Sequence, residues 1–115
     1  MLTIDVLKAS GADVESGLAR CMGMEDFYLS LVTKALQDKN FDVLKEKVTA
    51  KDYDAAFEAA HALKGVLGNL SLEPMYGFIC EITELLRARS DVDYAPYMTK
   101  LYEKKAELAK AAGGS

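Results

Sequence analysis

The sequence predicts an all-α protein, an up-and-down four-helix bundle with short additional helices at its N-terminus. Apolar residues recur every three or four positions along most of the 115 residues, which is the period of an amphipathic helix. The sequence lacks alternating runs of Val, Ile and Thr and hairpin turns of the Asn-Gly or Asp-Gly type. The connections between the predicted helices are short, so consecutive helices are expected to run antiparallel.

Length and composition predict one globular domain, residues 1–111, with a disordered C-terminal tail at 112–115. The chain is 50% hydrophobic and 28% charged, a balance typical of soluble folded proteins. We expect a cytoplasmic location because the N-terminus lacks the features of a signal peptide, and no apolar run approaches the roughly 20 residues that span a bilayer. A formal net charge of -4 argues against nucleic acid as a partner. Two cysteines, Cys21 and Cys80, are predicted to be reduced thiols, with a single disulfide as the alternative.

The predicted elements follow in order. Residues 4–22 are amphipathic but interrupted by Gly11 and Gly17, which predicts a short helix, a turn and a second short helix from about Asp13. Gly23 is expected to end this segment, as glycine often does at a helix C-terminus. A helix starting at residues 25–26, where acidic side chains favour a helix N-terminus, is expected to end near residue 40.

A further helix then turns Phe41, Leu44 and Val48 toward the core, and Asp52 is expected to cap the helix that runs over residues 53–69. Ser71 is predicted to cap the next helix, with proline in its first turn. The last helix is predicted to start near Pro96.

His61 is the only histidine of the chain. With a rotation of about 100° per residue and Ala56 at zero, it falls at about 140° on the predicted helix over residues 53–69. The apolar stripe of that helix lies within about 40° of zero and consists of Ala56, Ala60, Leu63, Leu67 and Leu70. The imidazole is therefore expected to face solvent on a flank of the bundle.

The same flank of the helix carries an unusual set of neighbours, namely Asp54, Phe57, Lys64, Gly65 and Gly68. A glycine inside a helix costs about 1 kcal/mol relative to alanine. Two of them beside a single histidine suggest that a bulky group approaches the ring, and the Lys64 ammonium would favour an anion there. The alternatives are an ordinary surface histidine, a frayed helix end at Gly68 and a close helix crossing at Gly65.

The run His61-Ala62-Leu63-Lys64-Gly65, followed by Gly68-Asn69-Leu70 and Leu72, resembles the signature of histidine-containing phosphotransfer (HPt) domains. These domains pass phosphoryl groups in two-component relays, and residues 11–36 also resemble the N-terminal helices of stand-alone bacterial members. Two positions depart from the family pattern. Ser71 stands where glycine is usual, and Thr83 stands where some members carry a Gln or Glu that hydrogen-bonds the imidazole.

The resemblance implies a phosphocarrier rather than an enzyme. It implies that His61 accepts a phosphoryl group from a phosphoaspartate of a receiver domain and passes it to another receiver. Histidine suits this task because it ordinarily titrates near pH 6.5, which leaves a neutral nitrogen nucleophile abundant at neutral pH. Lys64 would stabilise the phosphate charge, Gly65 would give steric access, and the expected partner contacts are Phe57, Gly68, Asp54 and Thr83.

The implied partners are response-regulator receiver domains and a hybrid sensor histidine kinase, with a monomer as the default state. No cofactor and no metal site of the chain's own is expected, since the receiver would supply Mg²⁺. A helical adaptor that binds receivers without being phosphorylated stays open, as does a kinase-attached domain phosphorylated by an ATP-dependent partner. A metal or haem bundle and an enzyme with His61 as general base are disfavoured, because the sequence shows no clustered ligands and no paired nucleophile.

Overall fold

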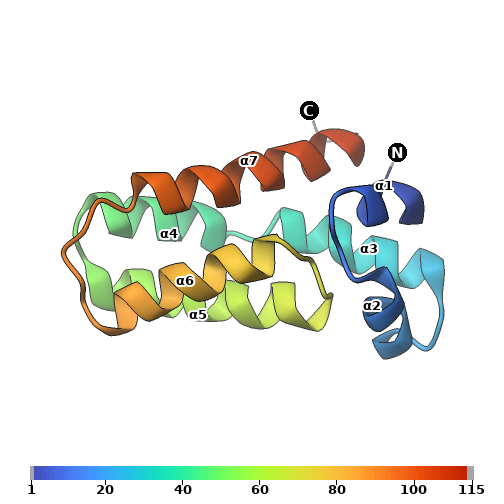
Figure 1. Ribbon diagram of the computed structural model, residues 1–115, viewed down its shortest axis with the longest axis horizontal. Helices are drawn as coiled ribbons and strands as arrows, with labels where there is room; N and C mark the ends of the chain where they lie inside the picture. Colours follow the sequence, from blue (N-terminus) through green and yellow to red (C-terminus); the bar gives the residue numbers. More distant parts are fainter. Residues whose placement is uncertain (1, 114–115) are drawn as a thin grey trace.

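The computed structural model describes residues 2–113, and Figure 1 shows an all-helical molecule. The described residues form seven helices and no strand: α1 Ile4–Ala9, α2 Val14–Arg20, α3 Glu25–Leu36, α4 Asn40–Thr49, α5 Tyr53–Asn69, α6 Met75–Arg87 and α7 Ala95–Ala111. Helices α4 to α7 pack as an up-and-down bundle in which each helix contacts the next. This confirms the predicted fold class.

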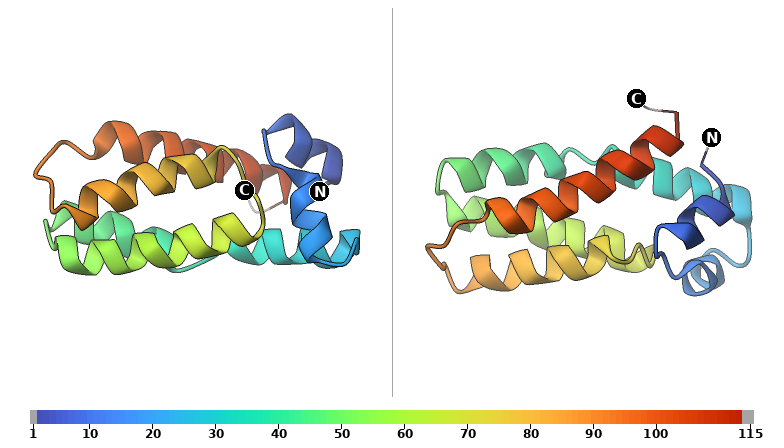
Figure 2. Two further views of the ribbon diagram at one scale, coloured as in Figure 1. Left: turned by 60° about the horizontal axis from the view of Figure 1, so that its bottom comes forward. Right: turned by 45° about the horizontal axis from the view of Figure 1, so that its top comes forward.

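The remaining helices extend the bundle at one end. Helix α3 continues the line of α4, while the short helices α1 and α2 gather beside the far end of α5 and α6 (Figures 1 and 2). The molecule is elongated, with principal extents of 41 × 27 × 20 Å.

A single apolar core runs along the bundle. Its largest fully buried side chains come from six helices and one turn: Leu7, Tyr28, Phe41, Leu44, Leu63, Leu67, Leu72, Met75, Ile79, Ile82, Leu86 and Leu101. Burying such a side chain contributes about 1.5–3 kcal/mol, so this stripe fixes how each helix is rotated. For α5 the buried face includes Leu63 and Leu67, which turns the opposite face toward solvent.

The start of the central helix α5 agrees with the prediction. Asp52 caps it by accepting a hydrogen bond at 3.3 Å from the backbone N–H of Ala55. Lys51, just before it, has a φ of 58° and makes the tight reversal from α4. The helix then runs from Tyr53 to Asn69, as predicted.

Three predictions about the helices are wrong. Helix α3 ends at Leu36 rather than near residue 40, where α4 already begins. Ser71 does not cap α6: it lies in the turn with a φ of 55°, and α6 begins at Met75 after Pro74. Gly17 does not interrupt a helix but lies inside α2, where a Cβ would come within 2.5 Å of the Tyr28 ring. Close packing of α2 on α3 therefore accounts for that glycine.

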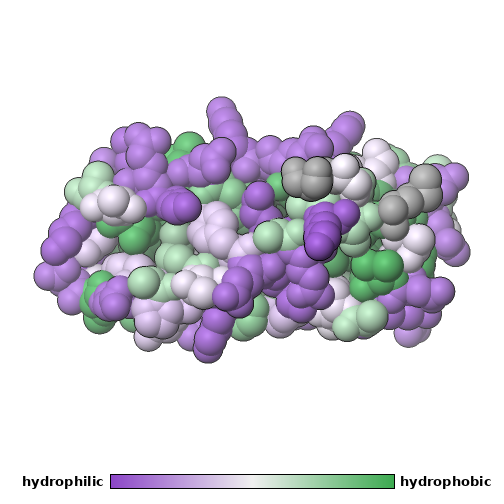
Figure 3. All heavy atoms as spheres, turned by 90° about the horizontal axis from the view of Figure 1, so that it is seen from above, coloured by the Kyte–Doolittle hydropathy of each residue, from purple (hydrophilic) through white to green (hydrophobic). Residues whose placement is uncertain are grey.

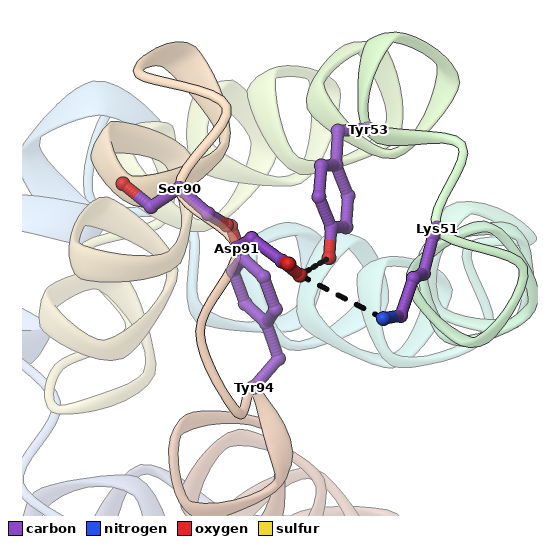
Figure 4. A network of polar contacts seen from close by, with 5 residues as sticks. All are labelled: Lys51, Tyr53, Ser90, Asp91 and Tyr94. Carbon is purple, nitrogen blue, oxygen red and sulfur yellow. Dashed lines mark hydrogen bonds and ion pairs between the residues drawn. The ribbon is translucent and has the colours of Figure 1, made fainter.

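The connection between α6 and α7 is fastened to the start of α5 by a small polar network (Figure 4). The Tyr53 hydroxyl donates to Asp91 at 3.0 Å, and the Lys51 ammonium lies 3.8 Å from the same carboxylate. Tyr94 donates to the Ser90 carbonyl at 2.7 Å, and its ring contacts that of Tyr53 at a centroid distance of 5.6 Å. The exposed ion pair contributes little by itself, so we assign the network a positioning role.

The turn between α5 and α6 is held by the N-terminal segment. The backbone N–H of Asp13 donates to the Ser71 carbonyl at 2.9 Å. The buried Tyr28 hydroxyl of α3 donates to the Leu70 carbonyl at 2.8 Å. Residues far apart in the sequence thus fix the end of the helix that carries His61.

The last helix reaches close to the end of the described residues. Helix α7 ends at Ala111, and Ala112 forms its cap and packs partly buried against the core. Residues 114–115 of the predicted tail lie outside the described residues. Cys21 is buried and Cys80 half-buried, and both are free thiols.

The surface seen from the α7 side shows many hydrophilic residues, with hydrophobic residues exposed between them (Figure 3). Across residues 2–113, no helix is both long enough and apolar enough to span a bilayer.

Candidate functional site

His61 lies on the exposed face of α5, as the helical wheel predicts. Its neighbours Ala60 and Leu63 are fully buried, so the core stripe anchors the helix on both sides of the histidine. The helix therefore presents the imidazole to solvent without help from a loop. A side chain on a packed helix is held in place more precisely than one on a mobile loop.

The imidazole stacks on an aromatic ring. The ring of Phe57, one turn earlier on α5, lies nearly parallel to it, with centroids 5.8 Å apart and an interplanar angle of 19°. The Arg87 guanidinium of α6 lies 5.1 Å from the centroid of the Phe57 ring, which is cation–π geometry. No side chain or backbone group among residues 2–113 forms a hydrogen bond with the imidazole.

His61 opens onto a groove of about 490 Å³. Helix α5 supplies one wall with Lys64, Gly65 and Gly68, which the sequence placed on this flank. The end of α5 adds Asn69, and the other lining residues come from the turn before α2, from α2, from the turn between α5 and α6 and from α6: Asp13, Ser16, Arg20, Ser71, Glu73 and Tyr76. Within the described residues Lys64 has no carboxylate at ion-pair distance, so its charge is available to an incoming anion.

Different structural features account for the glycines at positions 65 and 68 beside His61. A Cβ at Gly65 would meet nothing within 4 Å, so the position is open to solvent. A Cβ at Gly68 would lie 2.8 Å from the Tyr76 ring of α6, so this glycine makes room for Tyr76. Helix packing therefore explains Gly68, whereas the access role of Gly65 stays a prediction with which the open space is compatible.

The structure corrects the prediction for Thr83. This residue is fully buried, and its hydroxyl donates to the Ile79 carbonyl at 2.6 Å within α6. The contacts of Gly68 with Tyr76 and of Phe57 with Arg87 set an antiparallel register that places Thr83 level with His61. The threonine side chain nevertheless faces the core, where it can neither orient the imidazole nor contact a partner.

Asp54 lies apart from the His61 groove. Its carboxylate pairs with Arg89, at 2.6 Å from Nη2 and 2.8 Å from Nε. Together with Phe57 and Arg87 it lines a second, smaller hollow of about 340 Å³. The predicted site residues thus line two different hollows, the His61 groove and the smaller hollow beside Asp54. Phe57 lines the smaller hollow and also stacks on the imidazole.

Several residues of the site were not predicted from the sequence. Arg20 and Ser16 belong to α2, and their approach to α5 depends on how the N-terminal segment folds back. From the sequence, Arg87 could be interpreted only as a basic residue at the C-terminus of its helix. Tyr76 faces Gly68, and the neighbouring Cys80 side chain raises the pKa of the Tyr76 hydroxyl, chiefly through hydrogen bonding.

Other parts of the molecule do not add to this site. Among residues 2–113, no group of three or more His, Cys, Asp and Glu side chains is placed to hold a metal ion. A larger hollow of about 680 Å³ lies between the ends of α4 and α7, and none of the predicted site residues line it.

Comparison with known families matches residues 28–111 to the model described as Hpt domain. The chain belongs to the Hpt domain family. Hpt domains act in histidine phosphotransfer within two-component phosphorelays, where they serve as phosphocarriers and interact with receiver domains. The matched region contains His61 and every predicted site residue, whereas α1 and α2 precede it. No curated protein and no solved structure gave a significant match.

Proposed function

We propose that His61 is the phosphoryl carrier of this Hpt domain. It accepts the group from a phosphoaspartate of one receiver domain and passes it to an aspartate of another. In the accepting step the lone pair of Nε2 attacks phosphorus while Nδ1 keeps its proton. An N–P bond forms as the acyl phosphate P–O bond breaks, and the aspartate leaves as a carboxylate. The second receiver reverses the step.

The observation that carries this proposal is the exposure of the chain's single histidine on a helix flank, beside the open space at Gly65. In-line phosphoryl transfer requires the nucleophile, the phosphorus and the leaving oxygen to align between two proteins. A buried or enclosed imidazole could not meet an aspartate in another domain. The absence of a side chain at Gly65 leaves room for the receiver to approach.

Lys64 is the residue we assign to charge stabilisation. It lies three residues after His61 on the same helix face and lines the same groove. In the transition state of the transfer, the phosphoryl group carries negative charge on its peripheral oxygens. A nearby ammonium lowers the energy of this transition state. We assign the required Mg²⁺ to the receiver, so the catalytic work is divided across the interface.

Phe57 is assigned as a positioning residue. A ring stacked on the imidazole restricts its rotation while leaving both ring nitrogens free of hydrogen bonds within the described residues. Holding a nucleophile in its reactive orientation raises the transfer rate by removing orientational freedom before the reaction.

The test is phosphotransfer from a panel of receiver domains phosphorylated with acetyl phosphate, with wild type and His61→Gln compared side by side. We expect label on the wild type alone, with the acid lability and base stability of a phosphohistidine. Label on both proteins would refute the assignment to His61. Binding of a receiver without transfer would favour the adaptor alternative instead.

A further inference from the structure

Helix α2 forms a wall of the His61 groove although it lies before the region that matches the Hpt family model. Ser16 and Arg20 are one turn apart on α2, so they share a face, and that face lines the groove. Asp13, the N-cap of α2, lines it as well. The surface around the histidine is therefore completed by a segment outside the matched domain.

The distance from His61 to this wall is short compared with the size of a protein interface. Arg20 donates through Nη1 to the Gly68 carbonyl at 3.2 Å, and Gly68 lies about 10 Å along α5 from His61 at the helical rise per residue. Even a small specific interface covers roughly 600 Å² on each partner, a patch about 14 Å in radius. A receiver centred on His61 that spreads along the groove must therefore meet α2.

The chemistry of this wall also suits a partner contact. All three hydrogen bonds of Arg20, to Gly68, Asn69 and Ser71, use Nη1. Its Nε and Nη2 have no acceptor among the described residues, so they can donate to another protein. The Ser16 side chain likewise makes no hydrogen bond within residues 2–113, although its backbone N–H bonds to Asp13. The groove carries two cations, Arg20 and Lys64, and two carboxylates, Asp13 and Glu73, so it offers charged groups of both signs to a partner surface.

We infer that α2 is part of the receiver-docking surface and that Ser16 and Arg20 help to determine which phosphorylated receiver this domain recognises. This inference rests on the proposed function of His61. It adds that partner choice depends on residues outside the matched Hpt region. Such a contact should change receiver affinity and leave the reactivity of the imidazole unchanged.

The test compares Ser16→Glu with the chemically identical change Ser30→Glu on α3, where the exposed Ser30 does not line the groove. Ser16 occupies the third position of α2 after the Asp13 cap, where glutamate is favourable, so the variant is expected to fold. Each full-length protein is phosphorylated in two ways, by phosphoramidate and by receivers charged with acetyl phosphate. Phosphoramidate is small and reports on His61 without a docking surface.

We expect all three proteins to react with phosphoramidate at the same rate. With a receiver that phosphorylates the wild type, Ser16→Glu should raise KM about tenfold, the effect of losing one good interface contact, while Ser30→Glu should stay close to wild type. An unchanged KM for Ser16→Glu, or an equal rise for Ser30→Glu, would overturn the inference. A wild type that neither donor phosphorylates would overturn the proposed function itself, and with it this inference.

Discussion

At the scale of single residues, the two glycines after His61 show how one residue type serves two purposes on one helix. Gly68 removes a clash, since its Cβ would lie 2.8 Å from the Tyr76 ring, whereas Gly65 leaves open space. Their sequence context is similar, and only the packing of α6 separates them. Substitutions at the two positions should therefore have opposite effects on stability.

Gly68→Ala is expected to lower the free energy of unfolding by about 1–3 kcal/mol, because the added methyl group must displace Tyr76. Gly65→Ala should raise it by up to about 1 kcal/mol, because alanine is the better helix former and meets no neighbour. Urea denaturation of both variants measures the difference. The control is Gly68→Ala combined with Tyr76→Ala, in which the clash is gone. Equal effects at the two positions would contradict this account.

Gly65→Gln separates stability from function. Glutamine is a good helix former, so the variant should be at least as stable as the wild type. Its side chain would occupy the open space beside His61, and the rate of phosphotransfer from a receiver should fall by about tenfold or more as the partner is kept away. That rate is measured by mixing the variant with a phosphorylated receiver and quenching samples at successive times. A stable variant with wild-type transfer would remove Gly65 from the site.

Phe57→Leu tests the stacking contact. Leucine keeps most of the apolar volume, but it cannot stack on the imidazole or accept the cation–π contact from Arg87. We expect a several-fold lower transfer rate with little change in receiver affinity, and greater mobility of the His61 ring in NMR relaxation. An effect confined to affinity would instead identify Phe57 as a docking residue.

At the scale of elements, the turn between α5 and α6 depends on the N-terminal helices. Tyr28 reaches it from α3, Arg20 from α2, and the backbone of Asp13 also bonds to it. Burial, followed by the nearby Cys21 and Asp13 groups, raises the pKa of Tyr28 to about 12 from 10.0. The neutral hydroxyl is thus the form that the folded protein holds.

The raised pKa of Tyr28 predicts an alkaline loss of stability. Below pH 10 the tyrosine is neutral in both the folded and the unfolded states, so its contribution is fully present. As the pH rises from about 10 to about 12, only the unfolded state releases the proton, and the free energy of unfolding falls. For one group the slope is at most about 1.4 kcal/mol per pH unit.

The measurement is urea denaturation at several pH values for wild type, Tyr28→Phe and Tyr97→Phe. Tyr28→Phe should cost about 1 kcal/mol at neutral pH through the lost hydrogen bond to Leu70. It should also weaken the alkaline decline. Tyr97, half-buried on α7, makes no hydrogen bond within the described residues and serves as the control. Parallel pH profiles for the wild type and Tyr28→Phe would contradict the role assigned to Tyr28.

The elements also show what the sequence can predict. The Asp52 cap and the bounds of α5 follow from local residue preferences and helical period, and so does the outward direction of His61. Ser71 was mistaken for a cap because its true partner, the Arg20 guanidinium at 2.6 Å, lies far away in the sequence. The role predicted for Thr83 rested on the family resemblance, whereas in this chain Thr83 lies on the buried face of α6 with Ile79 and Ile82.

At the scale of the whole molecule, the bundle supplies a rigid support for one exposed side chain. Packing against its neighbours in the bundle fixes the rotation of α5 (Figure 1). Helix α2 and its cap Asp13 line the groove beside α5. The fold class could be predicted from the helical period of the apolar residues, and His61 from the motif around it. The groove could not, because it is formed by three helices brought together only by tertiary packing.

The central claim is that the phosphoryl group resides on His61, and the most direct test is its location after transfer. Wild-type protein phosphorylated by a receiver would be digested at alkaline pH, and the peptides analysed by mass spectrometry that preserves the N–P bond. We expect the phosphate on His61, together with a phosphohistidine signal in phosphorus NMR that is missing from His61→Gln. Phosphate on any other residue, or a full signal from His61→Gln, would contradict the account.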